Sequence, residues 1–147
     1  MQIAKEIPKR VHAVNRVVYI FGSKIKTSVL RTITPTYLRK DVISQLRTVD
    51  NIVNETLVEF DLIRTLSQVP VVLFPVNFGI EGKDVRSIAI RTFITNDFMT
   101  GLPATPGRDV PDACLKKILS RVRTEVPSIA RVCYDLTSKP PATTEWE

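Results

Sequence analysis

The segments VVLFPVNF (residues 71–78) and SIAIRTFIT (residues 87–95) decide the fold, because the loop GIEGKD (79–84) joins two strand-like sequences. Both segments are rich in β-branched and aromatic residues, and the two glycines between them are typical of a hairpin. Pro75 cannot donate to a sheet ladder, so we expect the first strand at a sheet edge or a bulge. Arg91 is charged in the middle of the second strand and must be paired, solvated or bound to an anion.

Similar helix–strand units flank this hairpin. Apolar spacing predicts a helix over residues 3–14 and a second helix from about Asp109 to Val126. Strands are expected to follow each helix, over residues 16–21 and 129–136. The sequence RVVY at residues 16–19 recurs as RVCY at residues 131–134, and the apolar helix positions recur at the same offset.

A long helix is expected between the first unit and the hairpin. Thr34-Pro35 is a favourable N-cap and first helical position. An apolar stripe then continues to a predicted helix end between Phe60 and Ser67; its members are Leu38, Val42, Leu46, Val49, Val53, Leu57 and Phe60. This order of elements predicts an α+β fold with two layers, in which a mostly antiparallel sheet of about four strands packs against helices.

The C-terminal tail, residues 139–147, contains the only tryptophan of the chain one residue from its end. Pro140 and Pro141 exclude a helix, and a terminal Trp indicates a docked segment, either a ligand clamp or a plug that completes the core. Lys139 beside threonine hydroxyls suits a phosphate, and Glu145 is an acceptor for the N–H edge of a base or for ribose hydroxyls. We therefore divide the chain into one domain, residues 1–136, and a tail, residues 137–147.

Composition indicates a soluble globular domain, with 44% hydrophobic and 24% charged residues and no apolar run long enough for a membrane span. The net charge is +8 through Arg47, from ten basic and two acidic residues. It is −2 over the remainder, from eleven basic and thirteen acidic residues. The basic third could bind an anion, although a solvated helix face is the more common explanation. Cys114 and Cys133 are far apart and are expected to be core thiols in a cytosolic protein.

The residues for a self-contained active site are missing. His12 is the only histidine and has no neighbouring cysteine or histidine, so we expect no metal site. No glycine-rich phosphate loop and no nucleophile elbow occur in the sequence. We therefore expect no catalytic residues in this chain.

Five sequence stretches resemble the C-terminal domain of GMP synthase, the glutamine-hydrolysing ligase. They are SKPPATTEWE (138–147), RVCYDLT (131–137), IRTFITNDFMTGLPATPG (90–107), NRVVYIFG (15–22) and TPTYL (34–38). The last two resemble the extended eukaryotic form of the family. The resemblance covers essentially the whole chain, and the tail is its most specific part.

This resemblance implies a homodimerisation and XMP-binding domain of an enzyme that converts XMP to GMP with ATP and glutamine-derived ammonia. In such enzymes the glutaminase activity and the use of ATP with Mg²⁺ belong to two other domains, the glutaminase domain and the ATP-pyrophosphatase domain. We therefore expect no cofactor on this domain. By the same resemblance, Gln68, Lys139 and Glu145 contact XMP, with Lys139 on the phosphate. Further candidate residues are Arg91, Asp97, Thr143 and Thr144.

Two other functions would fit parts of the sequence. A stand-alone RNA-binding module would use the basic third and would need aromatic side chains exposed on the sheet. Its candidates are Tyr19, Phe93 and Tyr134, which must also cover helices, so we expect no nucleic-acid partner. A purely structural dimerisation module would bind no ligand.

Overall fold

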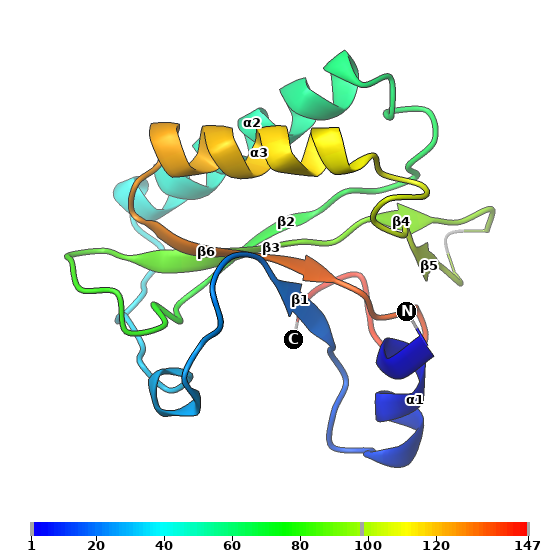
Figure 1. Ribbon diagram of the computed structural model, residues 1–147, viewed down its shortest axis with the longest axis horizontal. Coiled ribbons are helices and arrows are strands. Elements are labelled where there is room, and N and C mark those ends of the chain that lie inside the picture. Colours follow the sequence, from blue (N-terminus) through cyan, green and yellow to red (C-terminus); the bar gives the residue numbers. More distant parts are fainter. Residues whose placement is uncertain (1, 98, 147) are drawn as a thin grey trace.

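The centre of the molecule is a four-stranded sheet (Figure 1). In spatial order it contains β1 (Val18–Ile20), β6 (Ile129–Asp135), β3 (Arg86–Ile90) and β2 (Val71–Phe74). A two-stranded ribbon follows β3 and consists of β4 (Phe93–Ile94) and β5 (Leu102–Pro103). The helices are α1 (Gln2–Arg10), α2 (Lys40–Glu59) and α3 (Asp112–Glu125), with a 3₁₀ turn at Thr27–Val29. This computed structural model describes residues 2–97 and 99–146, so the predicted turn residue Phe98 and tail residue Glu147 lie outside it.

The sheet is mixed but mostly antiparallel, as predicted. β2 pairs with β3 and β1 pairs with β6 in antiparallel register, and only β3 and β6 run parallel. α3 connects these parallel strands, as a crossover requires. β2 lies at an edge of the sheet and ends just before Pro75, which confirms the expected edge position.

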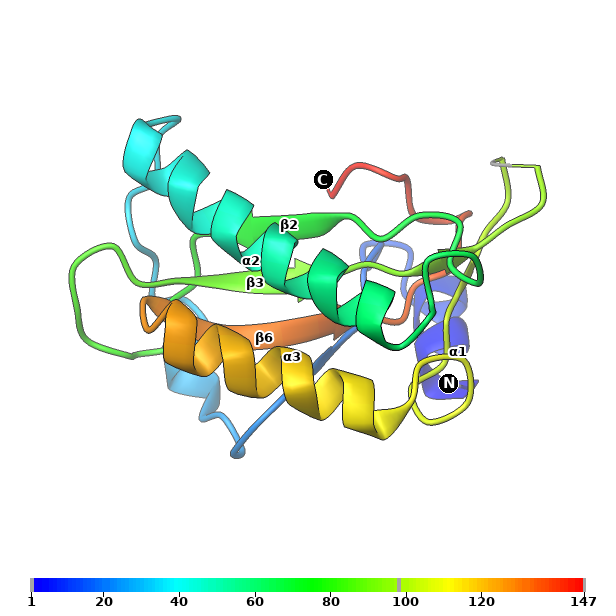
Figure 2. The same ribbon diagram turned by 90° about the horizontal axis from the view of Figure 1, so that it is seen from above.

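Helices α2 and α3 cover one face of the sheet (Figures 1 and 2). Alternation along the strands directs their larger apolar side chains to this face, where α2 buries most of its predicted apolar stripe. The resulting core contains Val49, Val53 and Leu57 from α2, Ile118 and Val122 from α3, and Ile88, Ile90, Val132 and Tyr134 from the sheet. The fold is therefore α+β, with the sheet and these two helices as its layers.

The predicted start of the long helix at Thr34 is wrong. Residue 33 instead forms a bridge with Val76, and the Thr34 amide donates to the Pro75 carbonyl at 2.8 Å. Next to it, the Thr36 hydroxyl accepts a hydrogen bond of 2.8 Å from Nε of the buried Arg86. These contacts hold residues 33–36 against the sheet, so the helix begins at Lys40 and Leu38 remains 90% exposed.

The strand predicted over residues 87–95 is interrupted after Ile90. At Arg91 the backbone amide donates to Pro70, and Phe93 then pairs with Gln68 and with Pro103. The chain changes its partners here, so one strand-like sequence forms two strands.

Both predicted helix–strand units are present, but they pack differently. α3 lies beside α2, whereas α1 lies on the other side of the sheet, next to the tail (Figure 1). Ala4 is the buried residue of α1 among those described, and Ile3 and Val11 of its predicted apolar stripe are exposed. The sequence repeat therefore reproduces the order of elements and not their surroundings. Within residues 2–97 and 99–146, every helix is too short or too polar to cross a bilayer.

Candidate functional site

The C-terminal tail lies on the face of the sheet opposite α2 and α3 (Figure 1). The Trp146 ring packs on Phe74 of β2, with ring centroids 5.1 Å apart and planes inclined by 35°. Its Nε1 donates a hydrogen bond of 2.9 Å to Oδ2 of Asp135, at the end of β6. These contacts confirm that the tryptophan docks the tail.

A group of three charged side chains lies beneath the tail, and we call Arg16, Arg91 and Asp135 the arginine–aspartate cluster. The Asp135 side chain is 0% exposed, Arg91 is 1% exposed and Arg16 is 11% exposed. Nη1 of Arg91 donates to Oδ2 of Asp135, and Nη1 of Arg16 lies 3.4 Å from the same oxygen. The other carboxylate oxygen accepts from the Thr137 amide at 2.8 Å. Such pairing is what a buried carboxylate requires.

Both arginines also hold the backbone of the tail. Nη2 of Arg91 donates to the Thr143 carbonyl at 2.6 Å, and Nη1 of Arg16 donates to the same oxygen at 3.2 Å. Nη2 of Arg16 donates to the Thr143 hydroxyl at 3.3 Å and to the Glu145 carbonyl. The guanidinium groups therefore connect the ends of two strands to the turn of the tail.

Arg91 was expected to be paired, solvated or bound to an anion, and the structure shows the first of these. It is paired with Asp135, and its guanidinium carbon lies 4.2 Å from the centroid of the Phe93 ring. Burial lowers the pKa of Arg91, the nearby Asp135 carboxylate raises it, and the Arg16 cation lowers it further. Arg91 therefore helps to hold the tail, through its hydrogen bond to the Thr143 carbonyl.

Lys139 is fixed at one edge of the β4–β5 ribbon. Its amide and carbonyl exchange two hydrogen bonds of 2.8 Å with Gly101. Its ammonium group donates to the Thr144 hydroxyl at 2.9 Å. A cation and a hydroxyl are thus adjacent, which is a donor pair suited to an anion.

Gln68 lies at the opposite edge of this ribbon, since it pairs with Phe93 of β4. Three strand spacings separate its backbone from that of Lys139, a distance of roughly 14 Å. Glu145 is exposed, and its backbone carbonyl accepts from Arg16 and from the Thr143 hydroxyl at 2.7 Å. The ribbon therefore holds Gln68 and Lys139 in one framework, and the tail adds Thr144 and Glu145.

Asp97 organises the loop between β4 and β5. Its carboxylate accepts from the amides of Met99 at 3.0 Å and Thr100 at 2.8 Å, and these contacts, with the Thr100 bond first, lower its pKa. The next residue, Gly101, pairs with Lys139. Asp97 therefore shapes the loop that leads to the Lys139 pairing.

Arg16 and Asp135 were not among the residues that the sequence singled out. A signal was present, because Asp135 alternates with the buried Cys133 on the same face of a central strand. The charged residue at that position needed a partner in the same way as Arg91.

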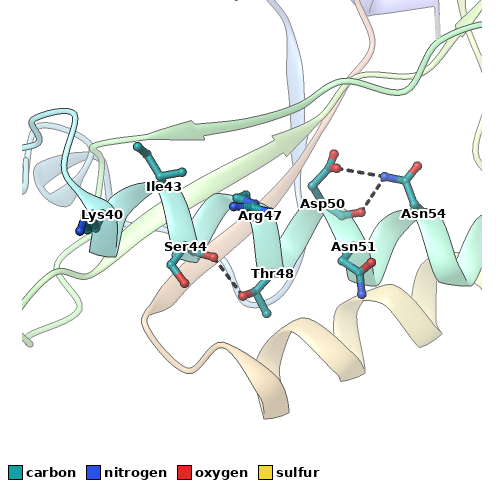
Figure 3. Close-up of a pocket in the computed structure, with 8 residues that line it drawn as sticks. All are labelled: Lys40, Ile43, Ser44, Arg47, Thr48, Asp50, Asn51 and Asn54. Carbon is teal, nitrogen blue, oxygen red and sulfur yellow. Dashed lines mark hydrogen bonds between the residues drawn. The ribbon is translucent and has the colours of Figure 1, made fainter.

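A surface hollow of about 660 Å³ lies along α2, away from these residues (Figure 3). Its lining is Lys40, Ile43, Ser44, Arg47, Thr48, Asp50, Asn51 and Asn54. All eight residues come from one helix, so no second element closes this hollow. It is a mostly polar, solvent-exposed face of α2.

The described residues offer little support for a cysteine nucleophile, an RNA-stacking surface or a metal site. Burial raises the pKa of both cysteine thiols, that of Cys133 to about 12, so neither is an activated nucleophile. Of the three candidate aromatic residues, Phe93 and Tyr134 are buried and Tyr19 is exposed, so the RNA-binding alternative lacks its stacking surface. In the described parts of the chain, no three histidine, cysteine or acidic side chains gather in a way that could hold a metal ion.

Comparison with known proteins gives one consistent result. The family described as "GMP synthase C terminal domain" matches residues 55–146. GMP synthase [glutamine-hydrolyzing] of Dictyostelium discoideum is 50% identical over 98% of this chain, and the probable GMP synthase of Caenorhabditis elegans is 42% identical over 98%. The GMP synthase of Saccharomyces cerevisiae is 41% identical over 74% of the chain.

This chain spans about a fifth of the length of these relatives, 21% in each case. The family match includes the hairpin, the β4–β5 ribbon and the tail, and it begins within α2. From the sequence motifs, the fold and these matches, we conclude that the chain belongs to the GMP synthase C-terminal domain family.

Proposed function

We propose that this chain is the XMP-binding and dimerisation domain of a cytosolic GMP synthase that makes GMP in purine biosynthesis. The observation that carries the proposal is the Lys139 ammonium group, held 2.9 Å from the Thr144 hydroxyl within the segment that matches the family. This pair offers N–H and O–H donors to a phosphate. Gln68 and Glu145 offer acceptors and donors to the rest of the nucleotide.

The spacing of these residues supports a nucleotide ligand. Gln68 and Lys139 lie on opposite edges of the β4–β5 ribbon, far enough apart to contact opposite ends of a nucleotide. Beneath the tail, Arg91 is paired with Asp135 and Arg16 donates to the Thr143 and Glu145 carbonyls, so we assign the anion site to Lys139.

In this proposal the domain supplies part of the XMP site and performs no chemistry alone. The glutaminase and ATP-pyrophosphatase domains of the enzyme supply ammonia and the activation by ATP with Mg²⁺. Partial sites bind weakly, because few groups offset the loss of ligand freedom. The isolated 147-residue chain should therefore bind XMP weakly in calorimetry, and tight binding would contradict this division of the site.

The test is Lys139→Ala in the GMP synthase that contains this domain. Loss of a charge-assisted contact to phosphate should raise the XMP KM by about 10-fold or more, since such bonds are among the strong ones. Glutaminase turnover should change little. Lys116→Ala is the matched control, because Lys116 is an exposed lysine of α3 on the other side of the sheet. An unchanged XMP KM in Lys139→Ala would rule out the phosphate role.

A further inference from the structure

Arg16 occupies an unusual place in the molecule. It lies just before β1, and it is outside residues 55–146, the segment that matches the family. Its guanidinium nevertheless reaches the tail, whose positions 138–146 lie inside that match. Arg16 thus contacts tail residues that lie 127 and 129 positions further along the chain.

The contacts of Arg16 converge on one turn of the tail. It donates to the carbonyl and the hydroxyl of Thr143 at 3.2 and 3.3 Å, and to the carbonyl of Glu145. The Thr143 hydroxyl in turn donates to the Glu145 carbonyl at 2.7 Å. One planar cation therefore closes the backbone on both sides of Thr144, the residue that contacts the Lys139 ammonium group.

The Arg16 side chain also contacts Asp135 and the Trp146 ring. Asp135 lies 3.4 Å from Nη1 of Arg16 and also accepts the Trp146 indole at 2.9 Å. The Arg16 guanidinium carbon lies 6.0 Å from the centroid of the Trp146 ring. With its side chain 11% exposed, Arg16 is held in place rather than extended into solvent.

We propose that Arg16 is a positioning residue for the nucleotide site, which fixes the tail so that Thr144 and Glu145 face the ligand. This inference rests on the proposed function. It assigns to the N-terminal segment, outside the family match, a part in forming a site whose ligand contacts lie inside that match. The ligand itself touches Lys139, Gln68 and Glu145, and Arg16 acts through the backbone of the tail.

The first experiment follows the tail in the 147-residue chain, where Trp146 is the only tryptophan and therefore reports on the tail alone. Arg16→Gln removes the cation but leaves the buried Arg91–Asp135 pair in place. We expect the Trp146 emission to shift to longer wavelength, and quenching by acrylamide to rise by roughly 2-fold as the indole is exposed to water. Arg16→Lys keeps the charge but not the planar fork, so its effect should be intermediate.

The chain offers a matched control in its own repeat. Arg131 is the counterpart of Arg16, is half-buried and donates to Ser23 at 3.2 Å. It lies four residues before Asp135 on β6, about 13 Å along the strand. Arg131→Gln makes the same change of charge and should leave the Trp146 emission unchanged.

The second experiment measures steady-state kinetics of the same variants in the GMP synthase that contains this domain. Arg16→Gln should raise the XMP KM by about 10-fold with kcat within about 2-fold, because a displaced tail weakens binding rather than the reaction. Arg131→Gln should leave both parameters at the wild-type values.

Two results would overturn the inference. One is an Arg16→Gln chain whose Trp146 remains as protected as in the wild type. The other is a released tail with an unchanged XMP KM, provided that Lys139→Ala raises that KM. If Lys139→Ala also leaves the KM unchanged, the proposed function fails, so the two failures are distinguishable.

Discussion

The two faces of the central sheet are built from different interactions. Under α2 and α3, the sheet presents apolar side chains such as Ile88, Ile90 and Val132 to a continuous core. Under the tail, the end of the sheet presents the arginine–aspartate cluster, and the contacts are directional hydrogen bonds. Apolar packing tolerates exchange of similar volumes, whereas a buried polar network has one satisfied arrangement. The helical face therefore stabilises the domain, and the tail face specifies where one segment lies.

The largest expected effect comes from removing the charge at the centre of the tail face. Asp135→Ala leaves the buried Arg91 cation without its partner, and the free energy of unfolding should fall by about 3–5 kcal/mol. Urea unfolding of the chain measures this loss. Glu125→Ala is the exposed control, because its pair with Arg121 is a surface salt bridge and should contribute less than about 1 kcal/mol.

A double variant separates stability from tail position. Replacement of both partners, Arg91→Met with Asp135→Leu, should recover part of the lost stability, because the buried Arg91 cation is removed together with its partner. The recovery is incomplete, since Arg16, 11% exposed, also loses the Asp135 carboxylate. The Trp146 emission should nevertheless stay that of a released tail, since the indole has lost its acceptor. A double variant that is stable and keeps Trp146 docked would show that the polar contacts do not specify the tail.

A smaller effect is expected where the β4–β5 ribbon meets Lys139. A Cβ atom on Gly101 would lie 2.9 Å from Cδ1 of Phe93, a ring that is 1% exposed. Gly101→Ala should destabilise the domain by about 1–3 kcal/mol through overpacking. It should also raise the XMP KM, because Gly101 pairs with Lys139.

A double-mutant cycle tests this contact directly. Phe93→Leu removes the edge of the ring, so Gly101→Ala should cost less in that background than in the wild type, as judged by urea unfolding. Equal costs in both backgrounds would mean that the ring does not limit the approach of the two segments.

The smallest effect concerns pH and the loop before Gly101. Amide hydrogen bonds lower the pKa of Asp97 in the folded chain below its ordinary value of 3.8. Its contribution to stability is therefore fully present above pH 4 or so and is lost as the pH falls through the lowered folded value. Amide hydrogen exchange at Met99 and Thr100 should accelerate over that range. Asp97→Asn should show fast exchange at neutral pH and a flatter profile, and an unchanged profile would exclude this role.

Much of the helical face could be predicted from the sequence. The hairpin of β2 and β3, the helix α3 and the strand β6 follow from local patterns: apolar periodicity, the loop glycines and the position of Pro75. The start of α2 could not be predicted in the same way. Thr34 has the chemistry of an N-cap, but the pairing of Ile33 with Val76 and the bond between Arg86 and Thr36 prevailed over that local preference.

The tail face could be predicted only in part. Trp146 indicated a docked segment, and this is confirmed, because its ring packs on Phe74. The cluster that holds the tail joins residues 16, 91 and 135, which lie far apart in the chain and meet only through the order of β1, β6 and β3 in the sheet. The ligand contacts of Gln68, Lys139 and Glu145 remain predictions.

The position of β6 has a consequence for the synthesis of the domain. Among the described strands, β6 is the last to be made and lies between the first strand and the middle ones. The ribosome delivers N-terminal residues first, so β1 and Arg16 have no sheet to join until residues 129–135 have emerged. The C-terminal tail follows β6 directly. Completion of the sheet and docking of the tail thus become a single late event in the synthesis of this domain.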